Sequence, residues 1–116
     1  SHDIVVVDMG DGTRLAELGR RVASLLVVGA DVRSVAAARM QARRLDLAGA
    51  LLVVRAGRGR GLPPEAVADA LGLPLAGVIR DDPRVPQLAA QGASVGSRPA
   101  ARLRRDAMRL FEEVRR

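Results

Sequence analysis

The chain contains no cysteine, lysine, asparagine, tyrosine or tryptophan, and Phe111 is its only aromatic residue. Without cysteine, disulfides and thiolate metal sites are excluded. Without further aromatic residues, the chain lacks the stacking platforms that bind single-stranded nucleic acid. A phosphate-binding P-loop ends in Lys-Ser or Lys-Thr, and no such loop is present. The chain is therefore not expected to hydrolyse a nucleotide by itself.

Other absences bear on the cellular location of the chain and on the classes of enzyme to which it could belong. No apolar run approaches the roughly 20 residues that a membrane-spanning helix needs. No signal peptide is visible, and we therefore expect a cytoplasmic location. The only histidine, His2, follows Ser1 in a start that looks like the remnant of a cleaved affinity tag, so the domain is taken as residues 3–116. With no other histidine, a serine-hydrolase arrangement is excluded.

The composition that remains is that of one small globular domain. Hydrophobic residues form 48% of the 116 residues, which is enough for a packed core. All 19 basic residues are arginine and the net charge is +6, a bias that GC-rich codons explain at least as well as function does. This charge permits weak attraction to DNA or anionic lipid, but it predicts no sequence-specific readout.

Short apolar runs alternate with helical patterns along the whole chain. The runs are typical of strands buried on both faces of a parallel sheet. Alternation of this kind predicts an α/β fold, with a doubly wound, mainly parallel sheet of about four strands and helices on both faces. The expected strands are 4–7, 25–28, 51–54 and 75–79, and the expected helices are 15–22, 35–45, 63–71, 85–91 and 99–114.

Ligands of such sheets bind at the carboxyl ends of the strands, so residues there are candidates for chemistry. Asp8 and Gly10 follow the first expected strand, where an acid could hold Mg²⁺ or approach a γ-phosphate. The same residues could simply form a turn and cap a helix. Asp81 and Asp82 follow the fourth strand, where turn formation is favoured over acid–base catalysis. The Gly-rich loop at 57–61 is basic but lacks the spacing of a nucleotide-binding fingerprint.

The last expected helix has an apolar stripe beside several arginines. A basic amphipathic helix of this kind could lie on an anionic membrane. The favoured alternative is a helix that packs on the sheet and turns its arginines to solvent.

The order and spacing of four blocks resemble the C-terminal half of a MinD/ParA-type ATPase domain. The blocks are residues 3–12, 31–45, 61–74 and 77–92, the last of which contains Gly-Val-Ile-Arg-Asp-Asp-Pro and ends in Gln-Gly. The likeness is greatest to actinobacterial septum-site-determining proteins and to the CpaE/TadZ proteins that localise Flp/tight-adherence pili. It implies a cytoplasmic positioning protein, in some members peripheral at the membrane, that dimerises around nucleotide.

The resemblance also implies which residues would meet a nucleotide. This portion lacks the phosphate loop, so no catalytic residue and no cofactor are expected in it, whereas a competent parent would bind ATP and Mg²⁺. An arginine stands near where many members have the asparagine that reads adenine, and another replaces a proline, which predicts weak binding or none. The implied positions are Asp8 and Gly10 on the Mg²⁺ and γ-phosphate side, with Asp8 the metal ligand, and Arg55, Arg80, Asp81 and Asp82 on the adenine side.

Half of a doubly wound domain exposes a sheet edge, which predicts self-association. The resemblance implies protein partners in the division or pilus machinery, with weak contact to membrane or DNA. Two alternatives stay open: a nonspecific DNA-binding partition module, and a protein-interaction scaffold that uses no nucleotide.

Overall fold

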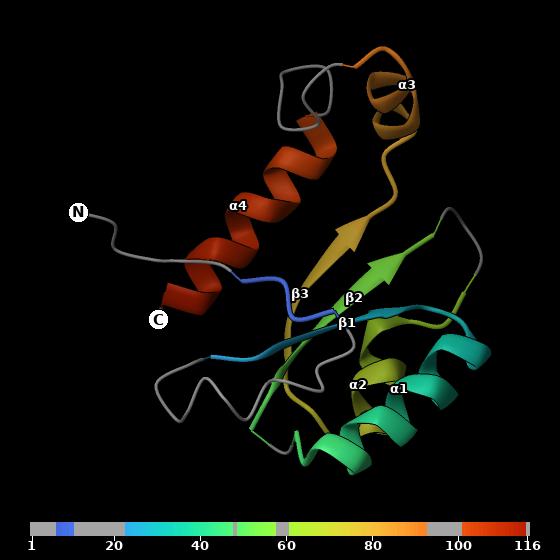
Figure 1. Cartoon of the computed structure of the whole chain (residues 1–116), viewed down its shortest axis with the longest axis vertical. Coiled ribbons are helices and arrows are strands. Elements are labelled where there is room, and N and C mark those ends of the chain that lie inside the picture. Colours follow the sequence, from blue (N-terminus) through green and yellow to red (C-terminus); the bar gives the residue numbers. More distant parts are fainter. Residues whose placement is uncertain (1–6, 11–22, 48, 58–60, 93–100, 116) are drawn as a thin grey trace.

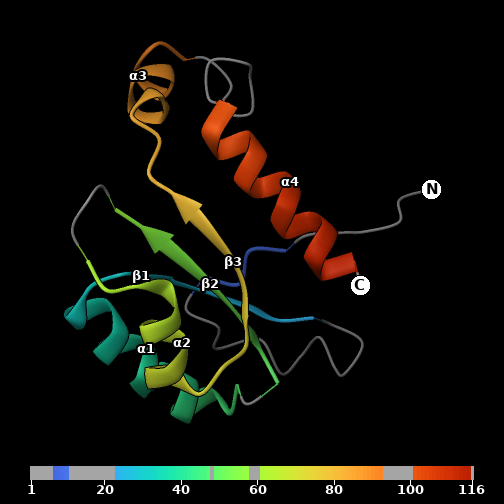
Figure 2. The same ribbon diagram turned by 180° about the vertical axis from the view of Figure 1, so that it is seen from behind.

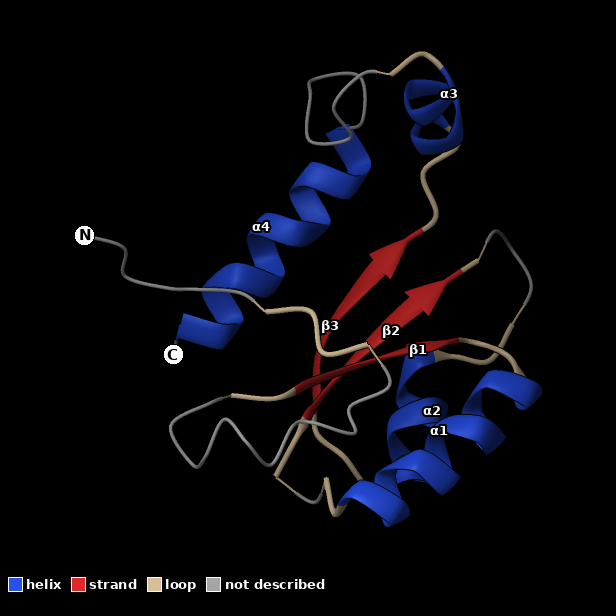
Figure 3. Ribbon diagram, viewed as in Figure 1, coloured by secondary structure: helices blue, strands red, loops and turns tan. Residues whose placement is uncertain are grey.

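The computed structural model describes residues 7–10, 23–47, 49–57, 61–92 and 101–115. Three strands form one parallel sheet in the order β1-β2-β3, and four helices connect or follow them (Figures 1 and 3). The coarse α/β expectation is confirmed. The elements are β1 (Leu25–Gly29), α1 (Val32–Leu45), β2 (Leu51–Ala56), α2 (Pro64–Leu71), β3 (Leu75–Arg80), α3 (Arg84–Ala90) and α4 (Ala101–Arg115).

The doubly wound sheet of four strands is not what the described residues form. Most of the expected strand at 4–7 lies outside them, and Val7, which is described, is in no strand and is 57% exposed. Both crossovers, through α1 and α2, lie on the same face of the sheet. The strands therefore follow one another across the sheet in chain order, β1-β2-β3. A doubly wound sheet needs a point where this order reverses, and the described part has none. The helix expected at 15–22 also lies outside the described residues.

Local sequence signals explain where the first two helices begin and end. The Asp31 side chain caps α1 by accepting hydrogen bonds from the Ser34 backbone N–H and hydroxyl, both at 2.7 Å. The backbone hydrogen bond from Ser34 holds the pKa of Asp31 below its ordinary value. Pro64 begins α2, and Gly72 ends it in the left-handed conformation that glycine adopts without strain. The expected start and end of this helix are confirmed.

The main core lies between the sheet and the α1–α2 pair. Leu52, Val54 and Val67 are fully buried there, with Val28 and Val35 packed around them. Because α1 and α2 also contact each other, they form one continuous helical layer.

Helix α4 covers the opposite face of the sheet, as the two views from front and back agree (Figures 1 and 2). Among the described elements it contacts only β3. Gly77 permits the close approach, since a Cβ atom there would lie 3.3 Å from Leu110 Cδ1. Of the two alternatives for the last helix, membrane binding and packing on the sheet, the structure shows packing on the sheet. No helix in the described ranges has both the length and the apolar character needed to cross a bilayer.

Candidate functional site

A cluster of charged residues lies where β2 and β3 end. The register places Arg55 beside Ile79 and Ala56 beside Arg80, so residues far apart in the chain become neighbours. The Asp81 backbone N–H extends the pairing by donating to the Ala56 carbonyl at 2.9 Å. The structure therefore brings together the four residues expected at the adenine side: Arg55, Arg80, Asp81 and Asp82.

Arg55 and Asp81 form an ion pair at the surface. Arg55 Nε lies 3.2 Å from Asp81 Oδ1, and the two side chains are 69% and 44% exposed. Exposed pairs of this kind contribute little to stability because water and salt screen them. Both members of the pair are nevertheless residues that the resemblance places on the adenine side.

Arg80 is held by a buried carboxylate on α4. Its Nε lies 3.1 Å from Asp106 Oδ2, its Nη2 lies 2.8 Å from Asp106 Oδ1, and its backbone N–H donates to Oδ2 at 2.8 Å. The Asp106 side chain is only 2% exposed, whereas that of Arg80 remains 45% exposed. This bidentate geometry is the strongest form of an arginine–carboxylate contact.

The two partners shift each other's proton affinity. Burial alone would raise the pKa of Asp106, but the hydrogen bonds and the charge of Arg80 outweigh it, and the pKa lies below its ordinary value. The Asp106 hydrogen bond raises the pKa of Arg80 in turn. Both groups are therefore charged at neutral pH.

Asp82 ties the same segment to the starts of two helices. It accepts hydrogen bonds from the Arg84 backbone N–H at 3.0 Å and from the Leu103 backbone N–H at 3.3 Å. The bond from Arg84 is the main reason that the pKa of Asp82 is lowered. Arg102 adds a long contact of 3.5 Å to the Asp81 carbonyl. Together these contacts fasten α4 to the end of β3.

Asp8 and Gly10 form a separate, exposed turn. Asp8 Oδ1 accepts a hydrogen bond from the Gly10 backbone N–H at 2.9 Å, and Gly10 has a φ of 58°. This is the turn alternative that the sequence left open for these residues. Nowhere in the described residues do three His, Cys, Asp or Glu side chains gather as metal ligands. Mg²⁺ is usually held by one or two carboxylates together with phosphate oxygens and water, so Asp8 would supply one ligand of the implied site, and its role as a metal ligand stays a prediction.

Asp106 is the residue that the sequence interpretation missed. A signal for it is present, because it follows Leu103 by three positions and precedes Leu110 by four, which places an acid inside the apolar stripe of a helix. An acid on a buried stripe calls for a cation within reach. The strand-end arginine supplies it.

Chemically, the cluster is a set of intramolecular charge pairs that joins the strand ends to α4. The Gly-rich loop expected nearby falls mostly outside the described residues, at 58–60.

Comparisons of this chain with protein-family models, with curated proteins and with solved structures gave no match.

Proposed function

We propose that this chain is a non-catalytic adaptor domain of the MinD/ParA-like positioning class, of the kind that marks a septum site or a pilus base. It acts by binding proteins and does not use a nucleotide. The parent protein, if it carries the rest of such a domain, is by this proposal a degenerate ATPase.

One observation carries the proposal: the candidate nucleotide residues are already paired with one another or with α4. The guanidinium of Arg80 is fixed by two hydrogen bonds to Asp106, and Arg55 is turned to Asp81. An adenine or phosphate group would compete with these charge-assisted hydrogen bonds for either arginine. The absence of lysine from the sequence supports the same conclusion.

Calorimetric titration of the chain with ATP in the presence and absence of Mg²⁺ tests the proposal. We expect no saturable binding. Arg104, an exposed arginine of α4 outside the cluster, supplies the matched control. Saturable binding that Arg55→Ala weakens and Arg104→Ala leaves unchanged would show that the cluster does take a nucleotide, and the proposal would fail.

Self-association is part of the same proposal. In the described part of the chain β1 pairs only with β2. Its exposed Leu25 and Val27 side chains lie on the sheet face opposite the α1–α2 core, the same face as α4, which contacts β3 and not β1. An open edge beside exposed apolar side chains favours pairing with a second copy. Light scattering during the ATP titration reports on it, and a monomer at high concentration would contradict it.

A further inference from the structure

A second surface lies on the outer side of the α1–α2 layer, away from the strand-end cluster. There the two helices border an open hollow of about 570 Å³. Val32 and Met40 of α1 line it and are 74% and 75% exposed, more than any other large hydrophobic residue that the structure describes. Apolar side chains this exposed at a concave surface are typical of an interaction site.

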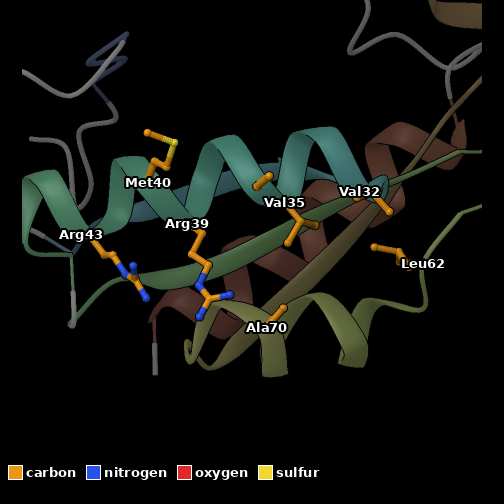
Figure 4. Close-up of a pocket in the computed structure, with 8 residues that line it drawn as sticks. Val32, Val35, Arg39, Met40, Arg43, Leu62 and Ala70 are labelled. Carbon is orange, nitrogen blue, oxygen red and sulfur yellow. The ribbon is translucent and has the colours of Figure 1, made fainter.

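One stripe of α1 gives the hollow its character. Val32, Ala36, Arg39 and Arg43 follow one another at spacings of four, three and four residues, so they lie on one face of the helix. Figure 4 shows Arg39 and Arg43 extended from α1 toward α2, with Val32 and Leu62 at the other end of the hollow. Met40 points from α1 away from α2. The surface is therefore apolar at one end and basic at the other.

The basic end is not neutralised by the described residues. The ion pairs among the described residues are those of Arg55 and Arg80 at the strand ends, and neither Arg39 nor Arg43 takes part in one. Asp46 and Asp69 line an adjoining hollow with the same two arginines, but neither carboxylate lies within ion-pair distance of them. Two positive charges thus remain available beside an apolar floor.

We infer that this groove binds an acidic amphipathic helix of a partner protein. Apolar side chains of the partner would lie over Val32, Ala36 and Leu62, while its carboxylates would pair with Arg39 and Arg43. A helix laid in a groove is a common way to recognise a peptide, and opposite charges fix its direction and register. The α1 stripe extends over about three turns, a length that an ordinary helix can match.

Other anionic partners fit this surface less well. Duplex DNA presents phosphates but nothing that would cover the apolar end, and a lipid surface is too flat to enter a hollow between two helices. The inference rests on the proposed adaptor function and names the chemistry of the partner that the adaptor binds.

A synthetic peptide of leucine and glutamate, with the leucines on one helical face, serves as the probe. Its controls are a scrambled peptide of the same composition and a peptide with lysine in place of glutamate. With ¹³C-methyl-labelled methionine, the Met40 methyl signal is expected to shift on titration, while that of Met108, on α4, stays in place. Fluorescence anisotropy of the labelled peptide gives the affinity.

Charge reversal on α1 supplies the decisive comparison. The double variant Arg39→Glu/Arg43→Glu is expected to weaken peptide binding by about tenfold or more. The double variant Arg33→Glu/Arg44→Glu changes the same charge on the same helix, at exposed positions outside the groove, and is expected to change binding by about twofold or less. The groove variant is further expected to gain affinity for the lysine peptide. Circular dichroism checks that both variants are folded.

Several outcomes would overturn the inference. Equal weakening by the two double variants would mean that only net charge attracts the peptide. Equal binding of the scrambled peptide would remove the amphipathic helix as the ligand. If the peptide does not bind, the inference fails, and phosphatidylglycerol vesicles, duplex DNA or loss of self-association in the groove variant would identify the true occupant. Nucleotide binding at the strand ends would refute the nucleotide-free function but would leave a Met40 shift intact, so the two failures are distinguishable.

Discussion

Replacing Asp106 by asparagine or alanine isolates the contact that joins α4 to the sheet. The carboxylate is 2% exposed and accepts three hydrogen bonds, two of them from a guanidinium. Asparagine keeps the shape and one acceptor oxygen, but it removes the charge and turns an amide donor toward the guanidinium. Alanine removes every acceptor and leaves the part-buried Arg80 backbone N–H without this partner.

The size of the effect follows from these losses. A hydrogen bond to a charged group contributes about 1.5–3 kcal/mol, and exposure of the guanidinium reduces what the pair contributes. We expect Asp106→Asn to lower the free energy of unfolding by about 2 kcal/mol and Asp106→Ala by about 3 kcal/mol. Urea denaturation followed by far-UV circular dichroism measures both values, since the chain has no tyrosine or tryptophan to report by fluorescence.

The pH dependence gives a sharper test. The folded-state pKa of Asp106 lies below its ordinary value of 3.8. The stabilisation is therefore fully present above the unfolded-state pKa and is lost as the pH falls through the folded-state pKa. The difference between wild type and Asp106→Asn is expected to be constant from about pH 7 to about pH 5 and to shrink below about pH 4.

Asp69→Asn provides the control, because Asp69 is an exposed carboxylate of α2 with no ion pair to another described residue. It is expected to change stability by less than about 0.5 kcal/mol. The reasoning would be refuted if Asp106→Asn were no more destabilising than this control. It would also be refuted if the difference from wild type stayed the same down to about pH 2.5.

Two glycines give further predictions from backbone geometry. Gly61 has a φ of 142°, and a Cβ there would lie 2.7 Å from the Ala30 carbonyl oxygen; we expect Gly61→Ala to cost about 2 kcal/mol or more, against about 1 kcal/mol for Gly72→Ala, where the space is open. Equal losses in urea denaturation would contradict the steric argument. Gly77→Ala is expected to cost only about 1 kcal/mol, because the atom that it meets is the flexible end of Leu110. A smaller loss in a Leu110→Ala background would confirm that contact, and an unchanged loss would contradict it.

The parts of the fold that the sequence predicted are those with local causes. Pro64 fixes φ at its own position, and Gly72 adopts the left-handed conformation without strain, so the start and end of α2 were predicted from these residues alone. The apolar runs at β1, β2 and β3 were equally clear, because a strand buried on both faces needs continuous apolar sequence. The doubly wound arrangement was not predicted correctly, since it depends on which face each crossover takes.

The candidate site shows the same division. The sequence placed Asp81 and Asp82 after one strand and Arg55 after another, and the structure has these residues at the ends of β3 and β2, which pair. The sequence did not give their partners. The contacts of Arg80 with Asp106 and of Asp82 with Leu103 depend on the packing of α4, and the Arg55–Asp81 pair depends on the register of β2 and β3. Asp106 could have been recognised as a buried acid, but its pairing with Arg80 required knowledge of which strand α4 covers.

The single-sided attachment of α4 has a consequence for how the chain folds. The unit from β1 to β3 joins successive elements of the chain throughout and shares one core, so it is expected to form as one cooperative unit. Among the described elements, α4 touches that unit only along β3. It therefore meets the conditions for a separate foldon, which docks after the sheet exists and opens before the sheet does. The buried Asp106 carboxylate contributes to the free energy of that opening, together with the packing of α4 on β3.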